Sequence, residues 1–132
     1  MLRDLRFKYV WLTGGWIAII AALIVCLVPG KYVEVANLND KVEHAAGFML
    51  LALWFCGIFV RRRYWLIAIG FILFGAVIEV LQGAMNWGRH ADVLDWCADS
   101  AGVIVGVLLS LTPLQNWPRW LEAIDPRKYA NK

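Results

Sequence analysis

The sequence predicts an all-α membrane protein, a polytopic bundle of four transmembrane helices in one domain covering residues 1–132. Hydrophobic residues make up 61% of the chain, against roughly 45–50% in soluble domains. Charged residues make up 17% and gather between apolar runs of about 15 to 22 residues, the length with which a helix crosses a bilayer. This pattern excludes disordered, disulfide-stapled and soluble nucleotide-binding proteins, and the net charge of +3 gives no argument for nucleic acid.

Each span is predicted from its apolar run and its boundaries. The first, residues 9–28, follows a basic start and is longer than the apolar core of a signal peptide, so we expect an uncleaved anchor. The second, 42–60, ends at the triplet Arg61–Arg63, and the third covers 64–83. The fourth, 93–111, ends before a proline.

A short helix is expected after the fourth span, within a tail of residues 114–132. Apolar residues recur there with helical spacing at Trp117, Trp120, Leu121 and Ile124. This pattern is typical of a helix on the membrane surface, with Trp117 and Trp120 at the headgroup level.

The distribution of basic residues predicts the orientation of the bundle. Ten Lys and Arg residues lie in the two terminal tails and the loop 61–63, against three in the other two loops. Basic loops stay inside, so we expect both termini to be cytoplasmic and the tail helix to lie on the cytoplasmic surface.

This orientation brings many polar residues of the second, third and fourth spans to the outer side. The pairs Lys41 with His44, Glu79 with Gln82, and Asp95 with Asp99 are three or four residues apart, so each pair shares one face of its helix. The predicted site consists of Asp40, Lys41, His44, Glu79, Gln82, Arg89, Asp92, Asp95 and Asp99.

Carboxylates inside a membrane need a reason, because an Asp at a helix centre costs roughly 2.5 to 3.5 kcal/mol on insertion scales. We expect Glu79 and Asp99 to face the bundle interior and to pair with Arg89, Lys41 or His44. The candidate catalytic residues are His44, Glu79, Asp95 and Asp99, which could exchange protons. The candidate substrate-binding residues are Lys41, Gln82, Arg89, Asp40 and Asp92, with Arg89 and Lys41 holding an anionic group.

Several functions remain open at this point. The cluster could belong to a membrane enzyme, bind an anionic lipid without chemistry, or simply pin helices together. A divalent metal on His44, Glu79, Asp95 and Asp99 is a further alternative, but the spacing specifies no geometry, so we expect neither metal nor cofactor. A transporter is weakly supported, because four spans without a repeat would need a dimer to build a pathway.

Two glycines continue the stripe of Asp95 and Asp99. Gly102 and Gly106 follow at helical offsets and give a smooth surface on which another helix can approach closely. We expect the fourth span to be central, and this face is the predicted contact for a second copy or an envelope enzyme.

The polar motifs resemble those of the VanZ-like family of small bacterial membrane proteins. Residues 40–48 resemble the family pattern Asp-Lys-x-x-His-x-x-x-Phe. Residues 79–82 resemble Glu-x-x-Gln, and a family pattern of Arg, Asp, Asn and Gly continues into the fourth span. The matching residues here are Arg89, Asp92, Asp95, Asp99, Gly102 and Gly106. The departure is Asp99, where the family more usually has Asn.

The resemblance implies a role in the bacterial cell envelope, at the inner membrane, with teicoplanin resistance as an implied link, but it implies no reaction. Together with the polar residues, it predicts an outward-facing pocket that recognises, and in one reading modifies, an anionic lipid or lipid-linked glycan. The alternative is a structural membrane protein that assembles with an envelope enzyme.

Overall fold

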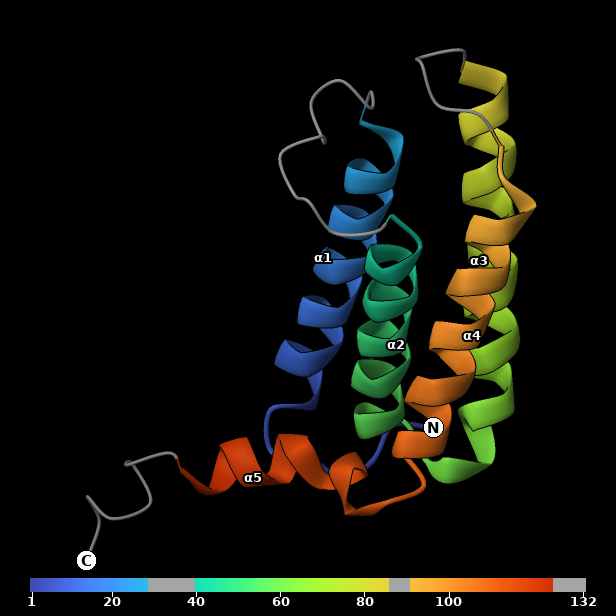
Figure 1. Cartoon of the computed structure of the whole chain (residues 1–132). Helices are drawn as coiled ribbons and strands as arrows, with labels where there is room; N and C mark the ends of the chain where they lie inside the picture. Colours follow the sequence, from blue (N-terminus) through green and yellow to red (C-terminus); the bar gives the residue numbers. More distant parts are fainter. Residues whose placement is uncertain (29–39, 86–90, 125–132) are drawn as a thin grey trace, which may run out of the picture.

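The computed structural model describes residues 1–28, 40–85 and 91–124. Four long helices run alternately up and down, as Figure 1 shows: α1 (Lys8–Leu27), α2 (Asp40–Ile58), α3 (Tyr64–Met85) and α4 (Val93–Leu109). The predicted all-α membrane bundle is confirmed, and each helix ends within about two residues of its predicted span.

Among the described residues, three helical segments are long and apolar enough to span a membrane: Lys8–Leu27, Lys41–Ile58 and Arg61–Met85, the last including the 3-10 turn η2 (Arg61–Arg63). The fourth, α4, has 17 residues and counts as a span together with the segment Pro113–Ala123, from which it is bent by 81°. At about 1.5 Å per residue, α4 is a little shorter than the ~30 Å hydrocarbon core of a bilayer.

The predicted tail helix is present as the 3-10 turn η3 (Pro113–Asn116) followed by α5 (Trp117–Ala123). As Figure 1 shows, this segment lies almost perpendicular to α4. It would therefore run along the membrane plane if α4 crosses the membrane. Residues 125–132 of the predicted tail lie outside the described residues.

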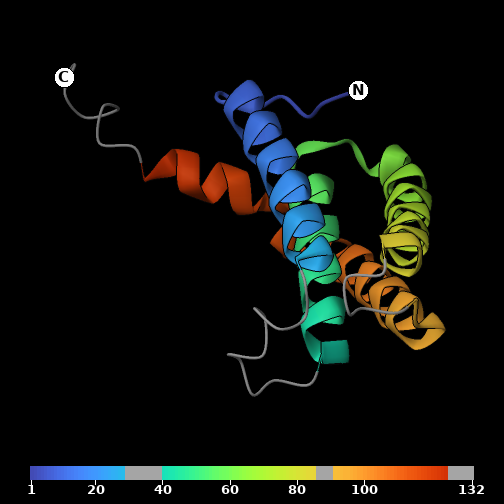
Figure 2. The ribbon, with the colours of Figure 1, turned by 90° about the horizontal axis from the view of Figure 1, so that it is seen from above.

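Helix α2 is the centre of the bundle and contacts α1, α3 and α4. Seen from above in Figure 2, α3 and α4 lie on one side of α2, and α5 points away on the other. The aromatic ring of Phe48 on α2 packs edge-on against Phe71 of α3, with 6.5 Å between ring centroids. Helix α1 fully buries only Gly15, and exposed apolar side chains such as Ile17 and Ile20 remain for lipid.

The N-terminal segment before α1 is bonded to the end of α2 and to the segment that contains η3 and α5. The Arg3 guanidinium donates to the carbonyl oxygens of Gly57 and Gln115 and to Oδ1 of Asn116. Glu122 of α5 accepts hydrogen bonds from the backbone N–H groups of Arg6 and Phe7 and from the indole of Trp11. These bonds hold α5 against one end of the bundle.

Trp117 of α5 packs against other helices of the bundle. Its ring packs against Trp11 and Trp54, with centroid separations of 5.2 and 4.7 Å. It also covers Gly57, where a Cβ would collide with the indole. Trp120, in contrast, is 49% exposed, as an interfacial residue would be.

Candidate functional site

The site depends on the close approach of two parallel helices, α2 and α4, which both begin at the same end of the bundle in Figure 1. A Cβ on Gly102 would collide with the carbonyl oxygen of Ala45, and one on Gly106 would lie 2.5 Å from the carbonyl oxygen of Met49. Both glycines therefore let the α2 backbone lie directly on α4, and this contact sets the register between the polar residues of the two helices.

The same contact shows which helix packs on the face of α4 that carries Gly102 and Gly106. Gly102 and Gly106 are buried against α2 of the same chain. The prediction that another helix approaches α4 closely is right, but the central helix is α2, not α4, because α2 contacts all three other long helices. The predicted contact for another protein on this face is wrong, because α2 already occupies it.

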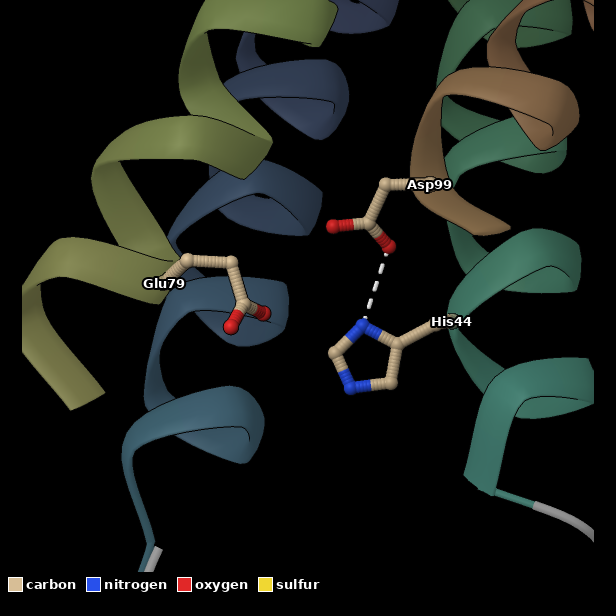
Figure 3. A group of neighbouring side chains, drawn as sticks. All are labelled: His44, Glu79 and Asp99. Carbon is tan, nitrogen blue, oxygen red and sulfur yellow. Dashed lines mark hydrogen bonds and ion pairs between the residues drawn. The ribbon is translucent and has the colours of Figure 1, made fainter. Parts of the chain in front are cut away.

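Three buried side chains meet where α2, α3 and α4 converge. The Nδ1 atom of His44 lies 2.9 Å from Oδ1 of Asp99, and their side chains are 5% and 0% exposed. Glu79 of α3 is 7% exposed. Figure 3 shows its carboxylate pointing toward the other two side chains, and one ligand atom from each residue lies within 4.8 Å of the others. We call His44, Glu79 and Asp99 the inner triad.

Two carboxylate oxygens of the inner triad have no hydrogen-bond partner among the described residues: Oε1 of Glu79 and Oδ2 of Asp99. The other oxygen of Glu79, Oε2, accepts the backbone N–H of Asp92 at 2.7 Å. Gly75 of α3, one turn before Glu79, makes room for Asp99, since a Cβ there would lie 2.9 Å from Oδ2. Buried acceptors are normally satisfied in native proteins, so these two atoms require an explanation.

An ion cluster lies one helical turn nearer the start of α2 and α4. The ammonium of Lys41 contacts Asp92 at 2.8 Å and Asp95 at 2.7 Å. The Lys41 side chain is 40% exposed and that of Asp95 is 11% exposed, so the cluster passes from solvent into the bundle. Asp92 also caps α4 by accepting the N–H of Leu94. The hydrogen bond from Lys41 and that from Leu94 lower the pKa of the Asp92 carboxyl below its ordinary value.

The described residues thus bring together six of the predicted site residues, which we call the polar cluster: Lys41, His44, Glu79, Asp92, Asp95 and Asp99. Lys41 pairs with Asp92 and Asp95, so the expected alternative in which it neutralises Glu79 is wrong.

The other three predicted site residues are not part of the polar cluster as the structure describes it. Gln82 is buried, and its Nε2 donates to the carbonyl oxygen of Cys26 at 2.8 Å, which ties α3 to α1. Asp40 is the first residue of α2, but the position of its side chain lies outside the description, and Arg89 lies outside the described residues. The sequence reasoning missed Gly75, whose only signal was its place one turn before Glu79.

The inner triad is able to support two kinds of chemistry. A carboxylate hydrogen-bonded to one ring nitrogen fixes the orientation of a histidine, which can then exchange protons at its other nitrogen. The same imidazole and carboxylate groups are also common ligands of divalent metals.

An apolar groove of about 420 Å³ lies away from the polar cluster, between α1, α2 and α3. Its lining includes Trp16, Phe55, Gly70 and Phe74. Phe74 packs against Phe48 at 5.9 Å between ring centroids, and Phe48 lies one turn along α2 from His44. Phe74 therefore connects the lining of the groove to the part of α2 that follows His44.

Comparison with protein families matches residues 7–114 to the family described as VanZ/LLP1. Neither curated proteins nor solved structures gave a significant match. The matched region contains α1 to α4 and all of the polar cluster. The chain therefore belongs to the VanZ/LLP1 family.

Proposed function

We propose that the polar cluster recognises the anionic headgroup of a membrane lipid or of a lipid-linked glycan in the bacterial inner membrane. In this proposal both termini are cytoplasmic and the cluster faces outward. Lys41, together with Arg89 from the sequence pattern, contacts the anionic group, and the inner triad lies beneath it. Modification of the headgroup is the further step for which His44 and the carboxylates are the candidate groups. The role would lie in the cell envelope, and the link to teicoplanin resistance stays an implication of the family.

One observation carries the proposal that a ligand binds here: the cluster leads from the partly exposed Lys41 to buried carboxylate oxygens that have no partner among the described residues. A network that only pins helices together would satisfy its buried acceptors, because an unpaired one costs about 1 to 3 kcal/mol. Groups held unsatisfied at the inner end of a polar path are typical of a site that receives a ligand.

The apolar groove adds a second support. Its lining of aromatic and aliphatic side chains suits a lipid tail, and it runs from Phe74, near the level of the inner triad, toward Arg63 at the start of α3. A lipid bound by its headgroup at the cluster could place one chain on this side of the bundle.

Native mass spectrometry of the protein, purified gently from its own membranes, tests the proposal. We expect the wild type to retain a defined anionic lipid that Arg89→Ala and Glu79→Gln lose, and its mass names the substrate class to test for turnover. Arg89→Lys should also lose it, since lysine lacks the two-pronged contact to phosphate. The same unspecific lipids in every variant would contradict the proposal and favour a structural role.

A further inference from the structure

The charge of the polar cluster raises a question about an anionic ligand. Among its described residues, four carboxylates face one lysine: Glu79, Asp92, Asp95 and Asp99 against Lys41. Lys41 is already bonded to Asp92 and Asp95, so its charge does not reach the inner triad directly. A further positive charge bound inside the cluster would favour the approach of an anion.

The inner triad has the composition and geometry to bind that charge. It offers one imidazole nitrogen and two carboxylates from three different helices, with ligand atoms within 4.8 Å of one another. Ligand atoms about 2.1 Å from one ion lie roughly 3 to 3.5 Å apart, so small side-chain rotations would close the site.

The two carboxylate oxygens without a hydrogen-bond partner are a second observation, independent of the ligand geometry, that points to a bound ion. Asp99 is fully buried and Glu79 nearly so, yet Oδ2 of Asp99 and Oε1 of Glu79 lack a partner in the described part of the chain. Buried charges are normally paired or coordinate a metal, because an isolated one is expensive to bury. A cation between these oxygens would satisfy both at once.

We propose that His44, Glu79 and Asp99 bind one divalent transition-metal ion, for which Mn²⁺ and Zn²⁺ are suitable probes. Mixed nitrogen and oxygen ligands suit these ions better than Mg²⁺ or Ca²⁺, which prefer oxygen alone. The ion would neutralise the two carboxylates of the inner triad and bridge to an oxygen of an anionic headgroup. This last part rests on the proposed function, whereas binding of the ion does not.

Binding is tested on the purified chain in detergent after removal of metals with a chelator. The signal of free Mn²⁺ in electron paramagnetic resonance should fall as the protein takes up one ion per chain, and Zn²⁺ should compete. Glu79→Gln and Asp99→Asn should each weaken affinity by at least roughly 100-fold, since even groups behind a metal ligand contribute about 10- to 100-fold.

Glu122→Gln is the matched control, because it makes the same chemical change in α5, where Glu122 accepts bonds from the N-terminal segment. Its Mn²⁺ affinity should equal that of the wild type. Asp99→Asn introduces the residue that the VanZ-like family pattern more usually has at this position. The fold of this variant is checked by circular dichroism and gel filtration. Independently of any variant, Mn²⁺ should raise the unfolding temperature of the wild type, and EDTA should reverse the rise.

Wild-type protein that leaves the Mn²⁺ signal unchanged, or equal affinity in wild type and both triad variants, overturns the inference. Lipid retention measured with and without EDTA separates it from the proposed function. Retained lipid without metal binding overturns the metal site and leaves the lipid site standing. Metal binding without a specific lipid supports the metal site and contradicts the lipid proposal.

Discussion

The carbonyl oxygen of Ala45 occupies the space that a Cβ on Gly102 would need. This contact joins the backbones of α2 and α4 just beyond the inner triad, and His44 is the residue next to Ala45 in the chain. The distance between His44 and Asp99 therefore depends on a glycine that carries no chemistry of its own.

Gly102→Ala should separate α2 from α4 and lower the free energy of unfolding by at least roughly 1 to 3 kcal/mol, the range for overpacking a close contact. Gly47→Ala on α2 is the control, because a Cβ there meets nothing within 4 Å. It should be neutral or gain up to about 1 kcal/mol from helix propensity. Unfolding in a fixed detergent compares the two, and equal effects would contradict the close packing.

Arg3→Lys should loosen α5 from the bundle. The guanidinium of Arg3 binds the carbonyls of Gly57 and Gln115 and the side chain of Asn116, which a single ammonium cannot match. We expect a loss of about 1.5 to 3 kcal/mol in unfolding free energy, the range for a charged hydrogen bond. Hydrogen exchange should rise in α5, whereas Arg62→Lys at an exposed position should leave it unchanged.

The attachment of α5 should also depend on pH through Glu122. Although partial burial opposes the shift, hydrogen bonds from Phe7, Trp11 and Arg6 lower the pKa of Glu122 below its ordinary value of 4.5. A lowered folded-state pKa adds stability that is complete above the unfolded-state pKa and is lost as the pH falls through the folded-state pKa. The wild type should thus be more stable than Glu122→Gln near neutral pH, and the difference should vanish in acid well below pH 4.5. A constant difference across that window would refute the role of the charge.

The orientation is testable on intact cells with cysteines introduced at positions 37, 62 and 88 in a background without native cysteines. Positions 37 and 88 should react with an impermeant reagent from outside, and position 62 only after permeabilisation. The reverse labelling would place the polar cluster on the cytoplasmic side.

The spans and the polar cluster follow from simple patterns. Hydropathy and charge predicted all four helices, and His44 was one of the three partners expected for the buried Asp99. Such features are local, because membrane insertion selects long apolar runs and helix geometry then assigns each polar residue to a face.

The partners of each side chain could not be predicted, because they depend on the register between helices. Nothing in the sequence indicated that Gln82 would bond to the carbonyl of Cys26, or that Lys41 would select Asp92 and Asp95 over Glu79. The sequence likewise did not indicate that Trp117 would cover Gly57 and pack beside Trp54 and Trp11.

The parallel pairing of α2 with α4 also has a consequence for biosynthesis. Because α3 lies between them in the chain, the helix that carries His44 is synthesised before the helix that carries Asp99. A nascent chain that stops before Val93 would expose Glu79 and His44 without their partner on α4. Such truncated chains should be cleared by membrane proteases faster than chains that stop after Leu109, which a pulse-chase experiment would measure.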